Sequence, residues 1–296
     1  MRLAERATSL GRMRSQILLP LVLLSAVPLA AQAESRPAKA SAATRPVDVA
    51  GMLQGMDEEE FKKMHELRKD QPPPRKGVTV EVGKDRAYLS LPPGKTGPLP
   101  AVLVIHEFWG LNEHIEHWCD RLASAGYVAL GIDLYKGQVA KTREDAVKFM
   151  QAVKLEEAVA TMKAMHEFLE KDPRVKATRT AALGWCFGGA MALRAGLEIP
   201  GLDAVVMYYG RPITEVETLK KLKAPLLGIF GTKDRGIPPE SVATFEAALK
   251  EAGCTATIRS YEAAHAFANP SGPAYDQKNA DAAYAVVQKF LAERLR

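Results

Sequence analysis

The stretch that decides the fold is TAALGWCFGGAMALRAG, residues 180–196. It opens with a continuous apolar run, which is typical of a β-strand buried on both faces. The run ends in GWCFG, residues 184–188, and a small, apolar helical stretch follows. A cysteine between glycines at such a junction is typical of a sharp turn that exposes a nucleophile. The motif is weak by itself, so the prediction depends on finding an acid, a base and anion-binding amides elsewhere in the chain.

Outward from this stretch, strand-like runs alternate with helical ones from about Gly77 to the C-terminus. VTVEV and RAYLSLP predict a hairpin. Further strands are predicted in PAVLVIHE, YVALGIDLY, LDAVVMYYG, PLLGIFGTKD and TATIRSYEA. We expect one long helix within TREDAVKFMQAVKLEEAVATMKAMHEFLEKD, and others after the later strands. This alternation predicts an α/β domain over residues 77–296, with a mostly parallel sheet covered by helices on both faces.

Three complementary side chains follow three of these strands. Cys186, Asp234 and His265 all lie at predicted carboxyl ends, which meet at one edge of a parallel sheet. Their chain order of nucleophile, acid and histidine is that of the α/β-hydrolase fold, with cysteine in place of serine. Each residue alone could be a buried thiol, a turn residue or a loop histidine. Their joint placement predicts an α/β-hydrolase fold and a catalytic triad.

The predicted turn also supplies an oxyanion hole. Gly184 and Gly188 leave room where a Cβ would clash, so Cys186 can take a strained conformation. The amide of Phe187 then faces the site from the start of a helix. We expect the second amide donor to come from the loop after PAVLVIHE, at Phe108.

The chain from about residue 77 to 296 resembles the dienelactone hydrolase family of α/β-hydrolases. The resemblance lies in HEFWGLNEHI, LASAGYVALGIDLY, GWCFGG, YYG at 208–210, GTKDRGIPPE and YEAAHAFANP. It implies Cys186 as nucleophile, His265 as general base and acid, and Asp234 as the group that orients the histidine. It also implies amide donors at Phe108 and Phe187, an ester or lactone substrate, and no cofactor.

Glu107 ends a predicted buried strand, where a carboxylate is costly unless it finds a partner. One interpretation is a satisfied structural acid, paired with a nearby arginine. The resemblance suggests another, in which the matching glutamate contacts the resting thiol and helps to activate it when substrate binds. A nearby anion raises a thiol pKa, so Glu107 would keep resting Cys186 neutral and poorly reactive.

The substrate side departs from the family. Dienelactone hydrolases hold a substrate carboxylate with arginines, and one of these positions is Asn269 here. Arg143 is a loose match for another, and its alternative is a solvated helix residue. Acidic dienelactones are therefore not the expected substrate. Trp109, Tyr135 and Tyr209 either line a pocket for a larger or neutral acyl group or are buried core.

The N-terminus has the pattern of a secretory signal peptide. Four arginines precede the apolar run ILLPLVLLSAVPLA at 17–30, and the A-x-A sequence at 31–33 predicts cleavage after Ala33. The run is too short to span a bilayer comfortably, so we expect a periplasmic or secreted protein without stable membrane insertion. An uncleaved anchor is the alternative. Residues 34–76 combine a polar, Pro-containing linker with a short charged helical arm.

Charge and cysteine content exclude several classes. Removal of residues 1–33 lowers the formal net charge from +5 to about +2, and no basic run is interleaved with aromatics, so we expect no nucleic-acid partner. No nucleotide-binding glycine motif follows a strand. His106, His114 and His117 lack the spacing of a zinc site, so no metal is expected. Three cysteines do not make a disulfide scaffold. Cys119 fits a buried small hydrophobe, and a Cys119–Cys254 bridge is an open alternative.

The sequence thus predicts a monomeric cysteine hydrolase that cleaves ester or lactone bonds. The first alternative is a general carboxylesterase of the same fold without dienelactone activity. The second is a non-catalytic binding or redox-sensing protein that uses Cys186 as a contact or as an oxidisable thiol. An interaction module built on the arm at 34–76 is a third.

Overall fold

The computed structural model of the protein describes residues 75–296. The predicted signal peptide, and the predicted arm except its last two residues, lie outside the described residues. The strands are β1 (Val78–Val82), β2 (Asp85–Ser90), β3 (Ala101–Ile105), β4 (Val128–Ile132), β5 (Thr180–Trp185), β6 (Ala204–Tyr208), β7 (Leu226–Gly231) and β8 (Ala256–Tyr261). The helices are α3 (Glu113–Ser124), α4 (Arg143–Ala152), α5 (Leu155–Lys171), α6 (Phe187–Glu198), α7 (Val216–Leu219), α8 (Pro239–Glu251) and α9 (Gln277–Leu295).

The strands of the described region form one eight-stranded sheet in the order β1-β2-β4-β3-β5-β6-β7-β8. The β1–β2 hairpin and the β2–β4 pair are antiparallel, and β4 to β8 run parallel. Every residue of β3, β4, β5, β6 and β7 is buried, because helices cover both faces. The predicted mostly parallel sheet is confirmed.

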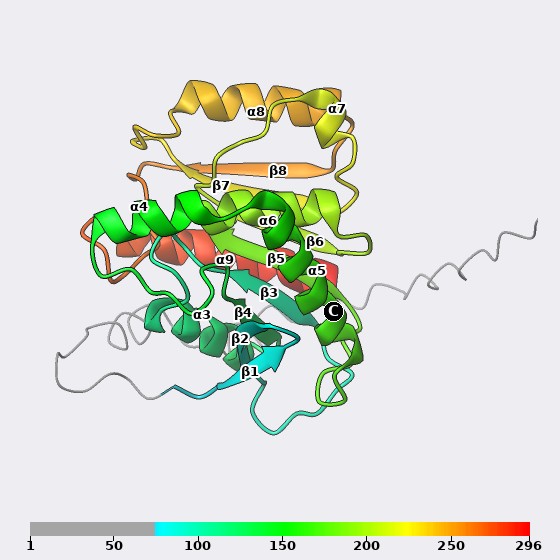
Figure 1. Ribbon diagram of the computed structural model, residues 1–296. Coiled ribbons are helices and arrows are strands. Elements are labelled where there is room, and N and C mark those ends of the chain that lie inside the picture. The colour runs from blue at the N-terminus through cyan, green and yellow to red at the C-terminus, as the bar shows by residue number, and fades with distance from the viewer. Residues whose placement is uncertain (1–74) are drawn as a thin grey trace, which may run out of the picture. The chain divides into compact units, whose positions relative to one another are not determined.

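Helices lie on both faces of the sheet (Figure 1), and an apolar layer separates each set of helices from the strands. On one face, buried side chains of α5, α6 and α8 pack against alternate strand residues. On the other face, α3 and α9 pack against the remaining strand residues. Strand residues alternate between the two layers because successive side chains point to opposite faces of a sheet. The central strand β5 is therefore held from both sides, directly before Cys186.

The expected long helix is α5, and a second helix, α4, precedes it in the same stretch; two extended residues separate them. Val153 and Lys154 have ψ values of 115° and 129°, outside the helical region. The apolar spacing gives no sign of the break. A β-branched residue loses little by leaving a helix, and the extended backbone packs Val153 against the core. Only Ala146 of α4 is fully buried, whereas α5 buries six residues, so α4 is the more loosely held of the two.

The three cysteines are free. Cys119 is fully buried in the layer under α3, which confirms the prediction of a buried small hydrophobe. Cys254 packs against the opposite layer, and its thiol donates to the carbonyl oxygen of Leu219 at 3.2 Å. A Cys119–Cys254 bridge is excluded because the sheet lies between them.

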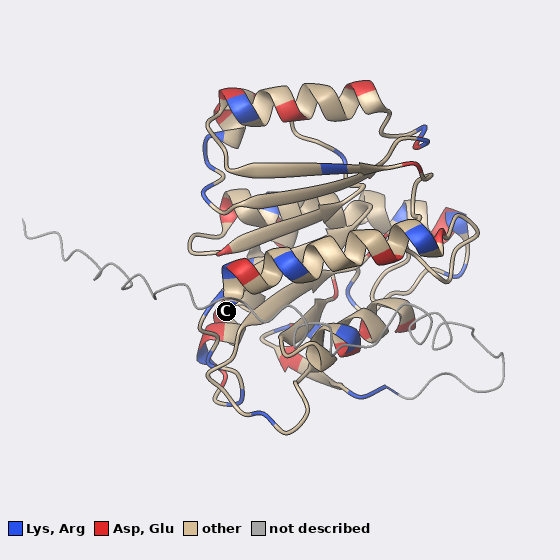
Figure 2. Cartoon of the chain, turned by 180° about the vertical axis from the view of Figure 1, so that it is seen from behind, with Lys and Arg blue, Asp and Glu red and all other residues tan. Residues whose placement is uncertain are grey.

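The surface of the described region mixes both signs of charge. Figure 2 shows Lys and Arg segments interspersed with Asp and Glu segments along the helices. None of the helices within 75–296 has the length and apolar character needed to cross a bilayer.

Candidate active site

Cys186 occupies the sharp turn between β5 and α6. Its φ of 53° and ψ of −117° are strained for a residue with a Cβ, at a cost of about 1–3 kcal/mol. The two flanking glycines allow this turn. A Cβ at Gly184 would lie 2.2 Å from the carbonyl oxygen of Gly188, and one at Gly188 would lie 2.2 Å from that of Ile105. The turn therefore requires glycine on both sides, as the sequence predicts.

Two backbone amides face the thiol. Burial raises the pKa of Cys186 to about 12, and the negative charge of Glu107 adds to the rise. Asp234 contributes in the same direction. The amide N–H groups of Phe187 and Phe108 act in the opposite direction, because both donate to the thiolate. The two predicted donors therefore converge on the sulfur, one from the start of α6 and one from the loop after β3.

Asp234 and His265 form a short hydrogen bond at the ends of β7 and β8. His265 Nδ1 lies 2.6 Å from Asp234 Oδ2. The other oxygen of Asp234 accepts from the amides of Gly236 at 2.8 Å and Ile237 at 3.0 Å. These bonds fix the carboxylate, and the carboxylate fixes the imidazole so that Nε2 is the nitrogen left for chemistry.

Tyr209 lies against the ring of His265. Its fully buried ring lies 5.1 Å from the ring of His265, centroid to centroid. Burial raises the pKa of the Tyr209 hydroxyl well above its usual value, and the charges of Glu107 and Cys186 add to the effect. Tyr209 is thus a buried core residue, as its alternative interpretation predicts, and it lies against the predicted functional groups.

Glu107 is buried, with 4% of its surface exposed, and hydrogen bonds hold both of its oxygens. Asn269 Nδ2 donates to Oε2 at 2.6 Å, and the Tyr209 hydroxyl is 3.4 Å from Oε1. His114 Nε2 lies 3.9 Å from Oε2, beyond hydrogen-bonding distance. Burial raises the pKa of Glu107 to about 7, and the bonds from Asn269 and Tyr209 oppose that rise. The alternative of an arginine partner is wrong for the described residues, since no lysine or arginine among them pairs with Glu107.

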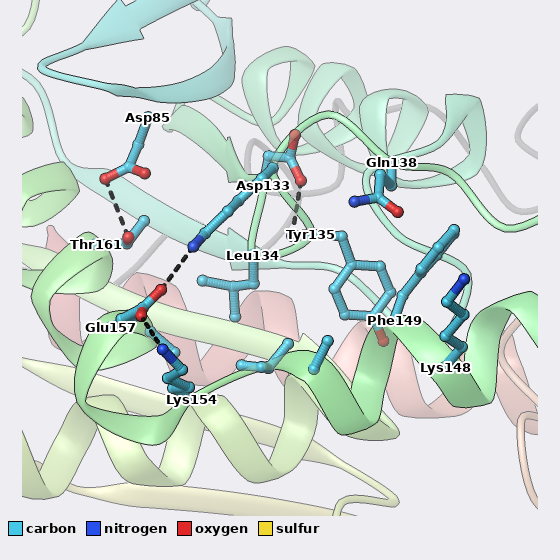
Figure 3. Close-up of a pocket in the computed structure, with 14 residues that line it drawn as sticks. Asp85, Asp133, Leu134, Tyr135, Gln138, Lys148, Phe149, Lys154, Glu157 and Thr161 are labelled. Carbon is cyan, nitrogen blue, oxygen red and sulfur yellow. Dashed lines mark hydrogen bonds and ion pairs between the residues drawn. The ribbon is translucent and has the colours of Figure 1, made fainter.

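Tyr135 lines a cavity of about 240 Å³ (Figure 3). Its hydroxyl donates to the carbonyl oxygen of Phe108 at 3.2 Å, and its ring lies 5.7 Å from that of Phe187. Among the charged residues that line the cavity, Glu157 pairs with Lys136 and Lys154. Cys186 and His265 do not line it, so this cavity lies beyond the reacting groups.

A larger cleft of about 600 Å³ is lined by Asn269 and Trp109, and Cys186 and His265 do not line it either. Trp109 is half-buried and packs edge-on against Phe108, with ring centroids 5.5 Å apart. Asn269 is only 6% exposed, and its amide group is already committed to Glu107. The cleft also contains Arg86 and Glu113, whose opposite charges leave it without a marked preference for anions.

Arg143 is not brought together with these residues. It is exposed at the start of α4 and lines a shallow depression with Glu144, Val147, Lys148 and Gln151. A role in substrate binding stays a prediction for this residue. His114 and His117 do not belong to a metal site: within the described region no group of three or more His, Cys, Asp or Glu residues could hold a metal ion.

The profile of the dienelactone hydrolase family matches residues 86–295, which include all of the site residues described above. The chain belongs to the dienelactone hydrolase family. Its predicted α/β-hydrolase fold is confirmed with this membership. Family membership also makes the protein an ester or lactone hydrolase.

Curated relatives and solved structures agree with this family. A putative carboxymethylenebutenolidase of Methylorubrum extorquens is 29% identical over 73% of this chain and 79% of its own length. Another, from Yersinia pestis, is 32% identical over 66% of this chain and 78% of its own. The crystal structure of a putative dienelactone hydrolase from Klebsiella pneumoniae superposes with a TM-score of 0.66 at 29% identity, covering 73% of this chain and 96% of that one.

Sequence reasoning missed two features of the site. Asn269 was considered only as a substrate contact, yet its amide donates to Glu107 across 162 positions in the chain. His106 was considered only as a metal ligand, yet its Nε2 accepts from the amide of Leu134 at 3.1 Å and its Nδ1 lies 2.6 Å from the carbonyl oxygen of Glu107. A buried carboxyl group needs a hydrogen-bond donor, so Glu107 at the end of a buried strand was the one sequence feature that indicated a missing partner.

Proposed function

We propose that this hydrolase uses Cys186 as its nucleophile, with His265 as general base and acid and Asp234 as the residue that orients the histidine. The observation that carries the proposal is the strained turn at Cys186, where two amides converge on the sulfur. The 2.6 Å bond between His265 and Asp234 supports the same assignment, because it leaves Nε2 for proton transfer.

The reaction follows from these groups. His265 Nε2 takes the thiol proton as Cys186 Sγ attacks the carbonyl carbon of the ester or lactone. The amides of Phe108 and Phe187 stabilise the oxyanion of the tetrahedral intermediate. As the C–O bond breaks, His265 returns the proton to the leaving oxygen, and a thioester remains on Cys186. His265 then takes a proton from water, and the hydroxide attacks the thioester. As the C–S bond breaks, His265 returns that proton to Cys186 Sγ, which restores the thiol and releases the acid.

Glu107 keeps the resting enzyme unreactive in this proposal. Its charge and the burial of the site hold the thiol neutral until a substrate enters. A neutral thiol suits an exported enzyme, because thiolates oxidise far more readily than thiols. The redox-sensor alternative has less support, since it needs an accessible thiolate.

We further propose a neutral or large acyl group as the preferred substrate. Asn269 is neutral and one of its N–H groups donates to Glu107, so this position does not offer a substrate carboxylate the positive charge of an arginine. The cleft beside it contains the apolar side chains Trp109, Leu111 and Val139. Trp109, which lines this cleft, is the aromatic residue best placed to contact such a group.

Export and a monomeric state complete the proposal. The basic start, apolar run and A-x-A sequence of residues 1–33 support cleavage after Ala33 and a periplasmic or secreted location. The intact mass of protein recovered from its own cells would check the cleavage, and a mass that retains residues 1–33 would contradict it. Sedimentation of that mature form would give the oligomeric state.

The deciding experiment is hydrolysis of a panel by the mature protein: p-nitrophenyl acetate, a neutral lactone and a dienelactone. Cys186→Ala and His265→Ala are run beside it, with Arg143→Ala as a charge-removing variant on α4. We expect turnover of the neutral substrates that disappears in the first two variants. Turnover that survives Cys186→Ala would sink the thiol mechanism, and selective loss of dienelactone cleavage in Arg143→Ala would reassign that arginine to the substrate.

A further inference from the structure

Glu107 is buried beside Cys186 without a fixed positive partner among the described residues. The titratable groups that face it are His114 from α3, Cys186 from the turn after β5 and Tyr209 after β6. Of these, His114 is buried and 3.9 Å away. The shortest contact to the carboxyl group is instead neutral, the 2.6 Å bond from Asn269.

The orientation of the Asn269 amide is fixed by its own loop. Its Oδ1 accepts from the backbone N–H of Ser271 at 2.9 Å. The backbone of Asn269 is held as well, since its N–H donates to the carbonyl oxygen of Ala266 at 3.0 Å. With Oδ1 occupied by a donor, only the NH₂ group can face Glu107. Asn269 therefore donates to Glu107 whether the carboxyl group is ionised or neutral.

We propose that Asn269 is a positioning residue whose neutral amide fixes Glu107 beside Cys186 and leaves that glutamate able to gain and lose a proton. A cation in its place would hold Glu107 ionised, and an apolar residue would leave the carboxyl group without its shortest bond. The inference deepens the proposed function, because it names what controls the charge next to the nucleophile. The effect of Asn269 on Glu107 can be tested by thiol alkylation, without substrate turnover.

The pH dependence of thiol alkylation reports this control directly. Iodoacetamide reacts with the thiolate, so the rate at Cys186 rises with pH until Glu107 ionises and its new charge raises the thiol pKa. We expect the logarithm of the rate to flatten near the pKa of Glu107, about 7, and then to rise again. In Glu107→Gln the flattening is absent and the rate rises evenly.

Two variants of Asn269 move the flattening in opposite directions. Asn269→Ala removes a hydrogen bond that favours the ionised carboxylate, so the flattening moves up by about one to two pH units. Asn269→Arg adds a permanent charge, so the flattening moves down by at least about one unit. The cleft beside Asn269 gives the longer side chain room. If Asn269 only stabilised its loop, the pH at which the rate flattens would shift in the same direction in both variants.

The chain carries its own controls. Alkylation is read for each cysteine by peptide mass spectrometry. Cys254, whose thiol donates to Leu219, reports the general reactivity of a half-buried thiol. Cys119 is 0% exposed and reports unfolding. Ser271→Ala keeps the backbone N–H that binds Asn269, so its profile matches that of the wild type.

Opposite shifts in the two Asn269 variants, with Cys119 still protected, would support the proposal. Equal shifts, no shift, or a flattening that persists in Glu107→Gln would overturn it. The result is separable from the proposed function. If alkylation shifts as expected while no ester or lactone is hydrolysed, the positioning role stands and the hydrolytic mechanism falls, and the reverse result rejects only the role of Asn269.

Discussion

Gly188→Ala tests whether close contact between α6 and β3 aligns the two amides that face Cys186. A Cβ at Gly188 would lie 2.2 Å from the carbonyl oxygen of Ile105 and 2.4 Å from that of His106. Both obstacles are backbone atoms, so no side chain can rotate away. A tolerable Cβ contact exceeds 3.0 Å, and the start of α6 must therefore move by about 1 Å.

That movement separates the Phe187 amide, on α6, from the Phe108 amide, which follows β3. Because a misplacement of about 1 Å costs roughly 10²-fold in rate, we expect kcat to fall about 100-fold on p-nitrophenyl acetate. The loss appears in kcat rather than in KM alone, since the oxyanion forms only on the way to the tetrahedral intermediate. Overpacking also destabilises the fold by about 1–3 kcal/mol.

Gly196→Ala is the matched control on the same helix. Its Cβ would meet side-chain atoms of Val205 and Leu222 at 2.6 and 2.7 Å, in the core and away from the turn. We expect a similar drop in the thermal midpoint with kcat within about threefold of the wild type. A Gly188→Ala enzyme that folds and retains kcat would refute the alignment argument. An equal loss of kcat in Gly196→Ala would show that instability alone explains the effect.

Two further outcomes follow from the site. Asp234→Asn should lower kcat by about 10³- to 10⁴-fold with the fold intact by circular dichroism. The amide oxygen would keep accepting from the backbone N–H groups of Gly236 and Ile237, so the NH₂ group would face Nδ1 as a donor and force the imidazole into the wrong tautomer. A loss below tenfold would reject Asp234 as the orienting group. Folding raises the pKa of Glu107 from 4.5 to about 7, so between these pH values the folded state binds more protons than the unfolded state. The free energy of unfolding of the wild type, relative to Glu107→Gln, should therefore fall as the pH rises from 4.5 to 7. Urea unfolding should show a fall on the order of 3 kcal/mol. A stability difference that does not change with pH would mean that the carboxyl group is not desolvated.

The sequence was sufficient for the parts of this protein that depend on local pattern. Continuous apolar runs identified the buried strands, and the glycines around Cys186 identified the turn, because only a residue without a Cβ fits there. The ends of successive parallel strands share one edge, so strand assignment alone brought Cys186, Asp234 and His265 together. The break between α4 and α5 could not be predicted, because the helical spacing of apolar residues continues across Val153. The extended backbone there is stabilised by the contact of Val153 with the core.

The environment of the Glu107 carboxyl group beside Cys186 depends on tertiary packing and not on local sequence pattern. A buried glutamate could be predicted to need a partner, but residues 107, 209 and 269 meet only after strands and loops distant in the chain have packed. Hydrogen bonds between side chains on different loops depend on distances of a few tenths of an ångström, which no periodicity encodes. The sequence therefore determined which groups are available for chemistry. The packing determined that a neutral amide, and no lysine or arginine of the described region, holds the acid beside the thiol.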